Sequence, residues 1–304
     1  MEAFALALRN EHTLFAKGTD HKDTIQIKTL AELPSILPAL LAEDDEELIQ
    51  FFMTIAGIVK RKEAKLTISL PSSLVLMNCG FLENVPANYL QKELDRLAYR
   101  LLRLEPTDPY NVDKALIITQ RKTVWLTSAG VAKKYIELLW EAALQAGLIL
   151  AAVENESIAA FRTTDFKEAC GYVEVIEQDI FLSGFSPEQG MFTVQSQFRG
   201  QVDKRLILQQ AFELFDTAAA DTFSQSSNPL PLFMDGQDYQ HLQDYQRQDT
   251  KRLTSLCLSE SVTSKAYTQE QLQAFALPIG LLLQPIFERR GKREKIRSDQ
   301  SRNK

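Results

Sequence analysis

The stretch from Lys65 to Arg162 limits the possible folds of this chain most strongly, because strand, turn and helix signals follow one another there without a break. Apolar residues alternate at its start, as in a half-buried strand, and a Pro-Ser-Ser turn leads into a second strand. Two helices follow, and between them two β-branched runs with a short polar link predict a hairpin. We therefore expect a strand-rich α/β unit. The stretch carries no catalytic motif.

The two helices of this stretch have recognisable ends. The first follows Pro86, and we expect Asn88 to be its N-cap. Its leucines recur at steps of four and three, so they share one face that another element must cover. They are Leu90, Leu94, Leu97, Leu101 and Leu104. The second helix begins near Ser128 and ends at Gly147, a residue suited to a left-handed C-cap.

The regions on either side of this stretch each predict a three-stranded meander. The expected strands are 4–8, 12–16 and 24–29 in the first meander and 172–176, 180–183 and 191–198 in the second, with a further strand at 230–234. Helices are expected at 30–41, 48–59, 205–218, 239–248 and 269–287. The acidic run from Glu43 to Glu47 is interpreted as a helix cap, because carboxylates at a helix N-terminus complement its dipole.

Size and composition limit the class of protein. A chain of 304 residues usually forms two domains. The net charge of −6 disfavours a general nucleic-acid binder, although residues 289–304 are rich in Lys and Arg. The three cysteines lie far apart without metal-ligand spacing, which predicts a reducing compartment. The chain shows no signal-peptide pattern and no run of the roughly 18 apolar residues that a membrane helix needs, so we expect a cytoplasmic protein.

Familiar catalytic sites are not predicted. The three histidines are His12, His21 and His241. None has a nucleophile or carboxylate at a recognised spacing, so the sequence does not indicate a hydrolase triad. No P-loop or Rossmann glycine motif occurs in the sequence. Trp125 and Trp140 occupy apolar positions of a predicted strand and helix, and we expect both to pack in the core.

Two segments resemble those of a known family. One is the run Ile-Ser-Leu-Pro-Ser-Ser-Leu-Val-Leu at 68–76, followed by Val85, Pro86 and the leucine-rich helix. The other runs from Val131 to Arg162 through Ala-Gly-Leu at 146–148. Both are similar to the insert of PilM-like proteins of type IV pilus assembly. The resemblance implies an actin-like (ribonuclease H-like), pseudo-duplicated α/β fold with an inserted α/β subdomain in the first half and a reduced second half.

The implied domain division follows this duplication. The first half spans residues 1–163 and includes an insert subdomain at about 70–127. The second half, 164–288, lacks most of its own insert, and 289–304 form a basic tail that we expect to be disordered.

PilM-like proteins bind ATP between their halves, where Asp-Ile-Gly turns hold Mg²⁺ and the phosphates. In this chain Ala7 takes the position of the first Asp and Arg9 that of the Gly, with Asn10 next to it. The carboxylate and the space for a close approach of phosphate are both missing from this turn.

The second set of turns departs from the family pattern as well. Glu174 offers a carboxylate, but Ile176 replaces the glycine and Glu177 repels a phosphate. Asp235 and Gly236 keep one glycine of the adenosine-side turn. Our hypothesis is a pseudo-ATPase without cofactor or enzymatic activity. In the alternative, Glu174 and Asp235 still support Mg-ATP, and the chain is an ATPase of pilus or type II secretion assembly.

The resemblance also implies partners. In the family, a groove beside the insert takes up the cytoplasmic N-terminal peptide of PilN, an inner-membrane protein, and an apolar peptide of this kind docks in pockets and on a strand edge. The residues of this chain that would form the groove are Leu74, Leu76, Leu90, Leu94, Leu97 and Tyr99. Alternatively, these leucines only cover the insert's own sheet.

The implied setting is the cytoplasmic face of the inner membrane. There we expect other pilus assembly proteins as partners and no nucleic acid. The basic tail is interpreted either as a solubilising end or as a patch that binds anionic lipid. In the second case, each basic residue near the membrane surface would contribute about 1 kcal/mol of binding free energy.

Overall fold

The computed structural model describes residues 2–118, 123–164, 168–176, 179–197, 204–223, 230–234, 253–286 and 289. Contacts group the chain into two compact units. The first unit consists of Met1–Leu70, Leu138–Asp165 and Cys257–Lys304, and the second of Pro71–Glu137 and Phe166–Leu256. This grouping follows contacts, whereas the expected halves 1–163 and 164–288 follow the order of a duplication along the chain.

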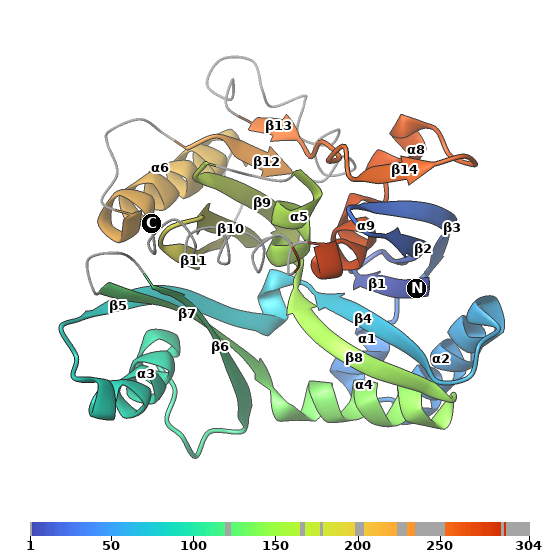
Figure 1. Ribbon diagram of the computed structural model, residues 1–304, viewed down its shortest axis with the longest axis horizontal. Coiled ribbons are helices and arrows are strands. Elements are labelled where there is room, and N and C mark those ends of the chain that lie inside the picture. Colours follow the sequence, from blue (N-terminus) through green and yellow to red (C-terminus); the bar gives the residue numbers. More distant parts are fainter. Residues whose placement is uncertain are drawn as a thin grey trace, which may run out of the picture. The chain divides into compact units, whose positions relative to one another are not determined.

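The first unit is built on a six-stranded sheet with the order β14-β3-β2-β1-β4-β8 (Figure 1). β1, β2 and β3 form the antiparallel meander that the alternation predicts, and β4 and β8 continue the sheet in parallel. The strands are β1 (Glu2–Leu8), β2 (His12–His21), β3 (Thr24–Pro34), β4 (Ala64–Leu70), β8 (Leu148–Asn155) and β14 (Val262–Ser264).

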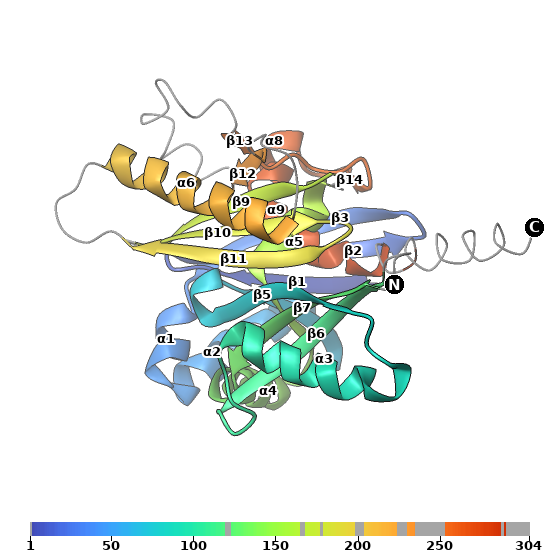
Figure 2. The same ribbon diagram turned by 90° about the vertical axis from the view of Figure 1, so that its left-hand side faces the viewer.

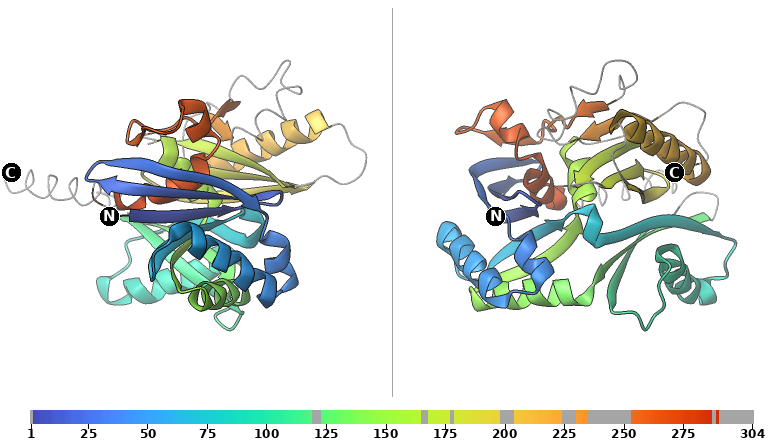
Figure 3. Two further views of the ribbon diagram at one scale, coloured as in Figure 1. Left: turned by 90° about the vertical axis from the view of Figure 1, so that its right-hand side faces the viewer. Right: turned by 180° about the vertical axis from the view of Figure 1, so that it is seen from behind.

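Helices of the first unit pack on this sheet through small and apolar side chains. They are α1 (Leu37–Ala42), α2 (Asp45–Val59), the C-terminal part of α4 (Lys133–Gln145), α5 (Glu156–Thr164), α8 (Gln269–Gln273) and α9 (Ala276–Leu282). α5 and α9 lie side by side (Figure 3). The acidic run does cap α2, because the Asp44 carboxylate accepts the backbone N–H of Glu47 at 3.0 Å.

The second unit contains a five-stranded sheet with the order β11-β10-β9-β12-β13. The strands are β9 (Cys170–Ile176), β10 (Asp179–Ser186), β11 (Gly190–Gln197), β12 (Leu232–Met234) and β13 (Leu253–Ser255). α6 (Lys204–Phe223) lies along β10 and β11 (Figure 2). Its aromatic side chains Phe215 and Phe223 pack against Phe192 with ring centroids 5.6 and 5.1 Å apart.

The two sheets have the same construction. In each, a three-stranded antiparallel meander is followed by two parallel strands added beside the first strand of the meander: β3-β2-β1-β4-β8 in one and β11-β10-β9-β12-β13 in the other. The pseudo-duplicated α/β fold that we expected is therefore present.

A three-stranded sheet with the order β5-β7-β6 forms the insert, within the second unit. Its elements are the 3-10 turn η1 (Ser72–Leu74), β5 (Val75–Glu83), α3 (Ala87–Leu102), β6 (Tyr110–Ile118) and β7 (Thr123–Ala132). α3 covers one face of this sheet (Figure 1). On the other face, the Thr127 hydroxyl accepts the backbone N–H of Met191 at 2.9 Å, which joins β7 to β11.

Several predicted helix boundaries were wrong. α3 begins at Ala87 with Pro86 as N-cap, so Asn88 is not the cap, and Leu104 lies beyond its end. The second helix begins at Lys133 and not near Ser128, because β7 continues to pair with β5 and β6 through Val131. Its predicted end is confirmed, since Gly147 has a φ of +72°.

Two further helices were misplaced. β3 continues to Pro34 because Leu30 and Leu33 pair with β2, so the predicted helix 30–41 shrinks to α1. The predicted helix 269–287 is broken into α8 and α9. Pro278 explains the break, since its ring would clash with the carbonyl of Ala274 in a continuous helix.

Trp125 is buried as expected, but Trp140 is 50% exposed. The buried side of α4 is formed by Leu139, Ala142 and Ala143, and Trp140 faces away from them. β13 and β14 were not expected at all. The predicted helix 239–248, the link 120–122 of the hairpin, His241 and the tail 290–304 lie outside the described residues.

Candidate functional site

The turn between β1 and β2 corresponds to the first phosphate-binding turn of the family, and its residue Arg9 forms an ion pair. Ala7 is fully buried in β1, and Arg9 and Asn10 form the turn into β2. The Arg9 guanidinium lies 3.7 Å from the Glu156 carboxylate, and their side chains are 10% and 0% exposed. Glu156 is the first residue of α5, where the helix dipole favours a negative charge. The positive charge at the glycine position is therefore directed to a carboxylate of the same unit.

Glu174, which corresponds to the Asp of the family's second phosphate-binding turn, is hydrogen-bonded to the backbone of the insert. Glu174 is buried on β9, and its two carboxylate oxygens accept the backbone N–H of Ser72 at 3.2 and 3.1 Å. Ser72 is the first residue of η1, at the start of the insert. The other residues predicted for this side, Glu177, Asp235 and Gly236, lie outside the described residues.

These residues do not fit a magnesium-phosphate site. Mg²⁺ needs several oxygen ligands that can be oriented toward it, whereas Glu156 faces Arg9 and Glu174 faces the N–H of Ser72. Within the described part of the chain, no group of three His, Cys, Asp or Glu side chains is placed to hold a metal ion.

The residues predicted to bind a partner peptide divide between the core and the surface of the insert. Leu94 and Leu97 are buried beneath α3 with Val124 and Leu126 of β7. Leu90 is half-buried against the same cluster. These leucines thus cover the insert's own sheet. The exposed or half-exposed members are Leu74, Leu76 and Tyr99.

Two separate hollows flank α3. Leu76 lines a small one of about 180 Å³ on the β5 side, together with Leu101 of α3 and Phe181 of β10. Tyr99 lines a larger one of about 1150 Å³ on the β6 side. The six predicted residues therefore do not form one continuous surface.

Surface features that the sequence reasoning missed lie on strand edges. β8 is the last strand in the order of its sheet, and Ile149 on it is 39% exposed. Phe81 of β5 is 50% exposed and lies over Trp125 with ring centroids 4.9 Å apart. Alternation marks such strands as half-buried, but it does not show which strand ends a sheet.

Comparison with known proteins identifies the fold. No family model matches the chain, and no curated protein matches its sequence. The chain is similar to a solved chain of the PilM-PilN type IV pilus biogenesis complex, with 15% identity, a TM-score of 0.69, and coverage of 94% of this chain and 99% of that one. The actin-like fold that the resemblance implied is thereby confirmed.

Two weaker structural matches accompany it. The cytoplasmic domain of EpsL, an inner-membrane component of the Vibrio cholerae type II secretion system, is 12% identical with a TM-score of 0.49, covering 93% of this chain and 95% of that one. A Bacteroides thetaiotaomicron protein with an actin-like ATPase fold and unknown function is 13% identical with a TM-score of 0.48, covering 90% and 95%.

Among the helices that the structure describes, none is both long and apolar enough to cross a membrane.

Proposed function

We propose that this protein is a cytoplasmic scaffold of type IV pilus assembly, which binds the N-terminal peptide of a PilN-like inner-membrane protein without hydrolysing ATP. Support comes from a likeness that extends over 94% of the chain to a structure of the PilM-PilN complex. Its place is the cytoplasmic face of the inner membrane, beside other pilus assembly proteins.

One observation carries the pseudo-ATPase part of this proposal: Arg9 takes the glycine position of the first phosphate turn, and its guanidinium pairs with Glu156 at the start of α5. A side chain at a position that requires glycine excludes the close approach of backbone N–H groups to phosphate. The carboxylate partner also opposes a polyphosphate, because like charges repel.

Isothermal titration with Mg-ATP tests this part. We expect no measurable heat of binding with the intact protein, nor any release of phosphate. Micromolar binding would instead support the alternative, an ATP-binding ATPase of pilus or secretion assembly. A Glu156→Gln variant serves as a control, because loss of the carboxylate would leave Arg9 able to attract phosphate if the turn were still open to it.

Of the predicted residues that are not buried in the core, Leu74 and Leu76 form the proposed peptide surface, because they lie together at the start of β5, whereas Tyr99 lines the separate hollow on the β6 side. Leu76 is 40% exposed beside the small hollow that Leu101 and Phe181 also line. An apolar side chain of an incoming peptide can fill a hollow of this size, while its main chain bonds to a strand edge. Leu94 and Leu97 support this surface from within the core.

Substitution of Leu76 tests the surface. Leu76→Asp should abolish binding of the N-terminal peptide of the PilN-like protein from the same genome, measured by fluorescence anisotropy, with an unchanged melting temperature. Leu214→Asp is the matched control, because Leu214 is an exposed leucine of α6, away from the insert. Equal binding by both variants would contradict the proposed surface.

The basic tail is proposed to contact anionic lipid at the membrane face. Residues 289–304 contain eight Lys or Arg residues against Glu294 and Asp299, and each basic residue near an anionic surface contributes about 1 kcal/mol. Removal of residues 291–304 should abolish co-sedimentation with phosphatidylglycerol vesicles at low salt. Unchanged co-sedimentation would contradict the lipid contact and favour the interpretation of the tail as a solubilising end.

A further inference from the structure

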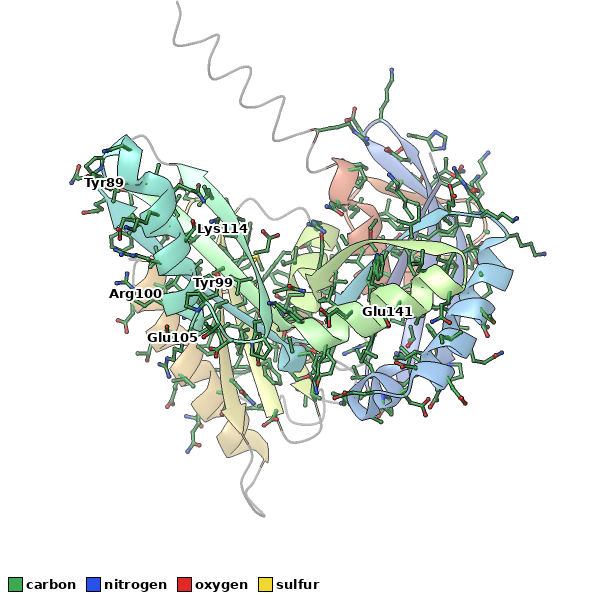
Figure 4. The ribbon with its side chains drawn as sticks, turned by 90° about the horizontal axis from the view of Figure 1, so that it is seen from below. Tyr89, Tyr99, Arg100, Glu105, Lys114 and Glu141 are labelled. Carbon is green, nitrogen blue, oxygen red and sulfur yellow. The ribbon has the colours of Figure 1, made fainter. Side chains whose placement is uncertain are left out.

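A groove separates α3 from β6 on the flank of the insert opposite Leu76. It has a volume of about 1150 Å³ and is lined by α3, the segment after it and β6. Tyr99 and Lys114 lie near each other in this groove, and Arg100 lies farther out on α3 (Figure 4). Ala98 and Val112 add apolar surface to its lining. The groove lies entirely within the second unit.

One wall of the groove is a basic stripe. Four residues of this wall recur at steps of four, four and three along α3 and its end, so they share one side of the helix. They are Lys92, Arg96, Arg100 and Arg103, and all four line the groove. Arg96 pairs with Glu93 at 3.1 Å. Among the described residues, no ion-pair partner is found for the other three cations.

The opposite wall is a free strand edge. In the described sheet, β6 pairs with β7 alone. The backbone N–H of Lys133 donates to the carbonyl of Pro109 at 2.9 Å, which places the odd-numbered residues of β6 in hydrogen-bonded pairs with β7. The even-numbered residues therefore direct their N–H and C=O groups outward. Those that line the groove or follow along it are Val112, Lys114 and Leu116.

A carboxylate already bonds to this edge. The Asp113 carboxylate accepts the outward N–H of Lys114 at 2.7 Å, where a carbonyl of an added strand would otherwise bond. The Lys114 ammonium in turn pairs with the Asp95 carboxylate of α3 across the groove. Charged side chains of this kind protect an edge from indiscriminate pairing. A specific partner must displace the Asp113 carboxylate from this N–H.

We propose that this groove binds an acidic peptide segment in an extended conformation, added to β6 as a fourth strand. The peptide's main chain bonds to the outward groups of β6, and its carboxylates lie against the basic stripe of α3. The inference does not rest on the proposed function, because the surface assigned there lies on the β5 side of α3.

The chemistry of the two walls favours a peptide over other anions. Nucleic acid or a nucleotide would meet Asp95, Glu105 and Asp113 in the same groove and has no N–H donors spaced to match the outward carbonyls of a strand. A peptide supplies both donors and acceptors at strand spacing. The peptide's side chains are expected to be acidic rather than basic, because the four cations of the stripe outnumber the three carboxylates that line the same groove.

Fluorescence anisotropy with a designed probe tests the proposal. The probe is a fluorescein-labelled octapeptide with Glu alternating with Val, compared with the same peptide carrying Lys in place of Glu. We expect only the acidic peptide to bind, with an affinity that falls as salt is added. The double variant Lys92→Gln/Arg100→Gln should weaken its binding at least about tenfold. The matched control Lys28→Gln/Lys62→Gln removes two exposed lysines of the first unit and should leave binding unchanged.

The strand edge has its own test. Asp113→Ala removes the carboxylate that covers the Lys114 N–H and should raise the affinity for the acidic peptide several-fold. Saturation with peptide should also slow hydrogen exchange of the outward amides of β6 in the intact protein. The proposal is overturned if the acidic peptide does not bind at millimolar concentration, if the Lys peptide binds equally well, or if Lys92→Gln/Arg100→Gln binds like the control.

Discussion

Both carboxylate oxygens of Glu174 accept the backbone N–H of Ser72, at 3.2 and 3.1 Å, although the two residues are 102 positions apart in the chain. The contact joins β9, the first strand of the second meander, to the turn that opens the insert. A residue that the sequence offered as a ligand for Mg²⁺ thus has a structural contact within its own unit.

Replacement of Glu174 should destabilise the fold. Glu174→Ala removes the acceptor and leaves a buried N–H without this charge-assisted bond, so we expect the free energy of unfolding to fall by about 1.5–3 kcal/mol. Urea denaturation followed by circular dichroism measures the change. Glu141→Ala is a matched control on an exposed face of α4 and should change stability by less than about 0.5 kcal/mol. A loss of similar size in both variants would contradict the structural role of Glu174.

Replacement of Gly280 by a residue with a side chain should destabilise the fold. A Cβ atom on Gly280 would lie 2.0 Å from the carbonyl oxygen of Ala159, so α5 and α9 would have to move apart. We expect Gly280→Ala to lower the free energy of unfolding by about 1–3 kcal/mol. Gly57 offers the opposite control: it lies inside α2, where an added Cβ atom would have no neighbour within 4 Å, and Gly57→Ala should raise stability by up to about 1 kcal/mol. Equal effects of the two substitutions would exclude close helix packing as the cause.

The three cysteines should differ in reactivity. Burial raises the pKa of the Cys79 thiol to about 12 and also raises the pKa of the Cys170 thiol, whereas Cys257 is exposed. Because the thiolate is the nucleophile, iodoacetamide at pH 8 should modify only Cys257 in the folded protein. Mass spectrometry of the tryptic peptides measures the sites, and modification in urea provides the control in which all three react. Rapid native labelling of Cys79 or Cys170 would show that its surroundings open.

The contact of Arg289 with Asp20 should make stability depend on pH. Arg289 Nη1 and Nη2 donate to the two Asp20 carboxylate oxygens at 2.7 and 2.6 Å, and this hydrogen bonding lowers the pKa of Asp20. Since the folded pKa lies below the unfolded one, the stabilisation is present above about pH 3.9 and is lost as the pH falls through the folded value.

Arg289→Ala should therefore lower the free energy of unfolding by about 1 kcal/mol at pH 7, because the pair is partly exposed and screened by solvent. The difference from the unsubstituted protein should shrink and then vanish as the pH falls through the lowered folded pKa of Asp20. Thermal unfolding at a series of pH values measures it. A difference that stays constant down to about pH 2 would show that packing of the Arg289 side chain, and not the ion pair, stabilises the fold.

Local patterns predicted most elements of this fold correctly. Alternation in the two meanders and the leucine spacing of α3 arise from the periods of strand and helix, which neighbouring residues alone create. The same spacing placed Leu94 and Leu97 on the covered face of α3, where they are buried. Errors occurred where a distant partner extends an element: pairing of Leu30 and Leu33 with β2 extends β3 against the local signals.

The candidate site depended on tertiary structure in a different way. From the sequence alone, Arg9 and Glu174 were departures from a phosphate-binding pattern. Only the folded chain brings Glu156 to Arg9 and Ser72 to Glu174, across separations that no local pattern spans. Likewise, the stretch from Lys65 to Arg162 predicted its own strands and helices, but tertiary pairing placed β4 and β8 in the sheet of the first unit and β5, β6 and β7 in the insert. Which of its strands end a sheet, and which side chains line the groove between α3 and β6, was decided by pairing and packing between distant segments.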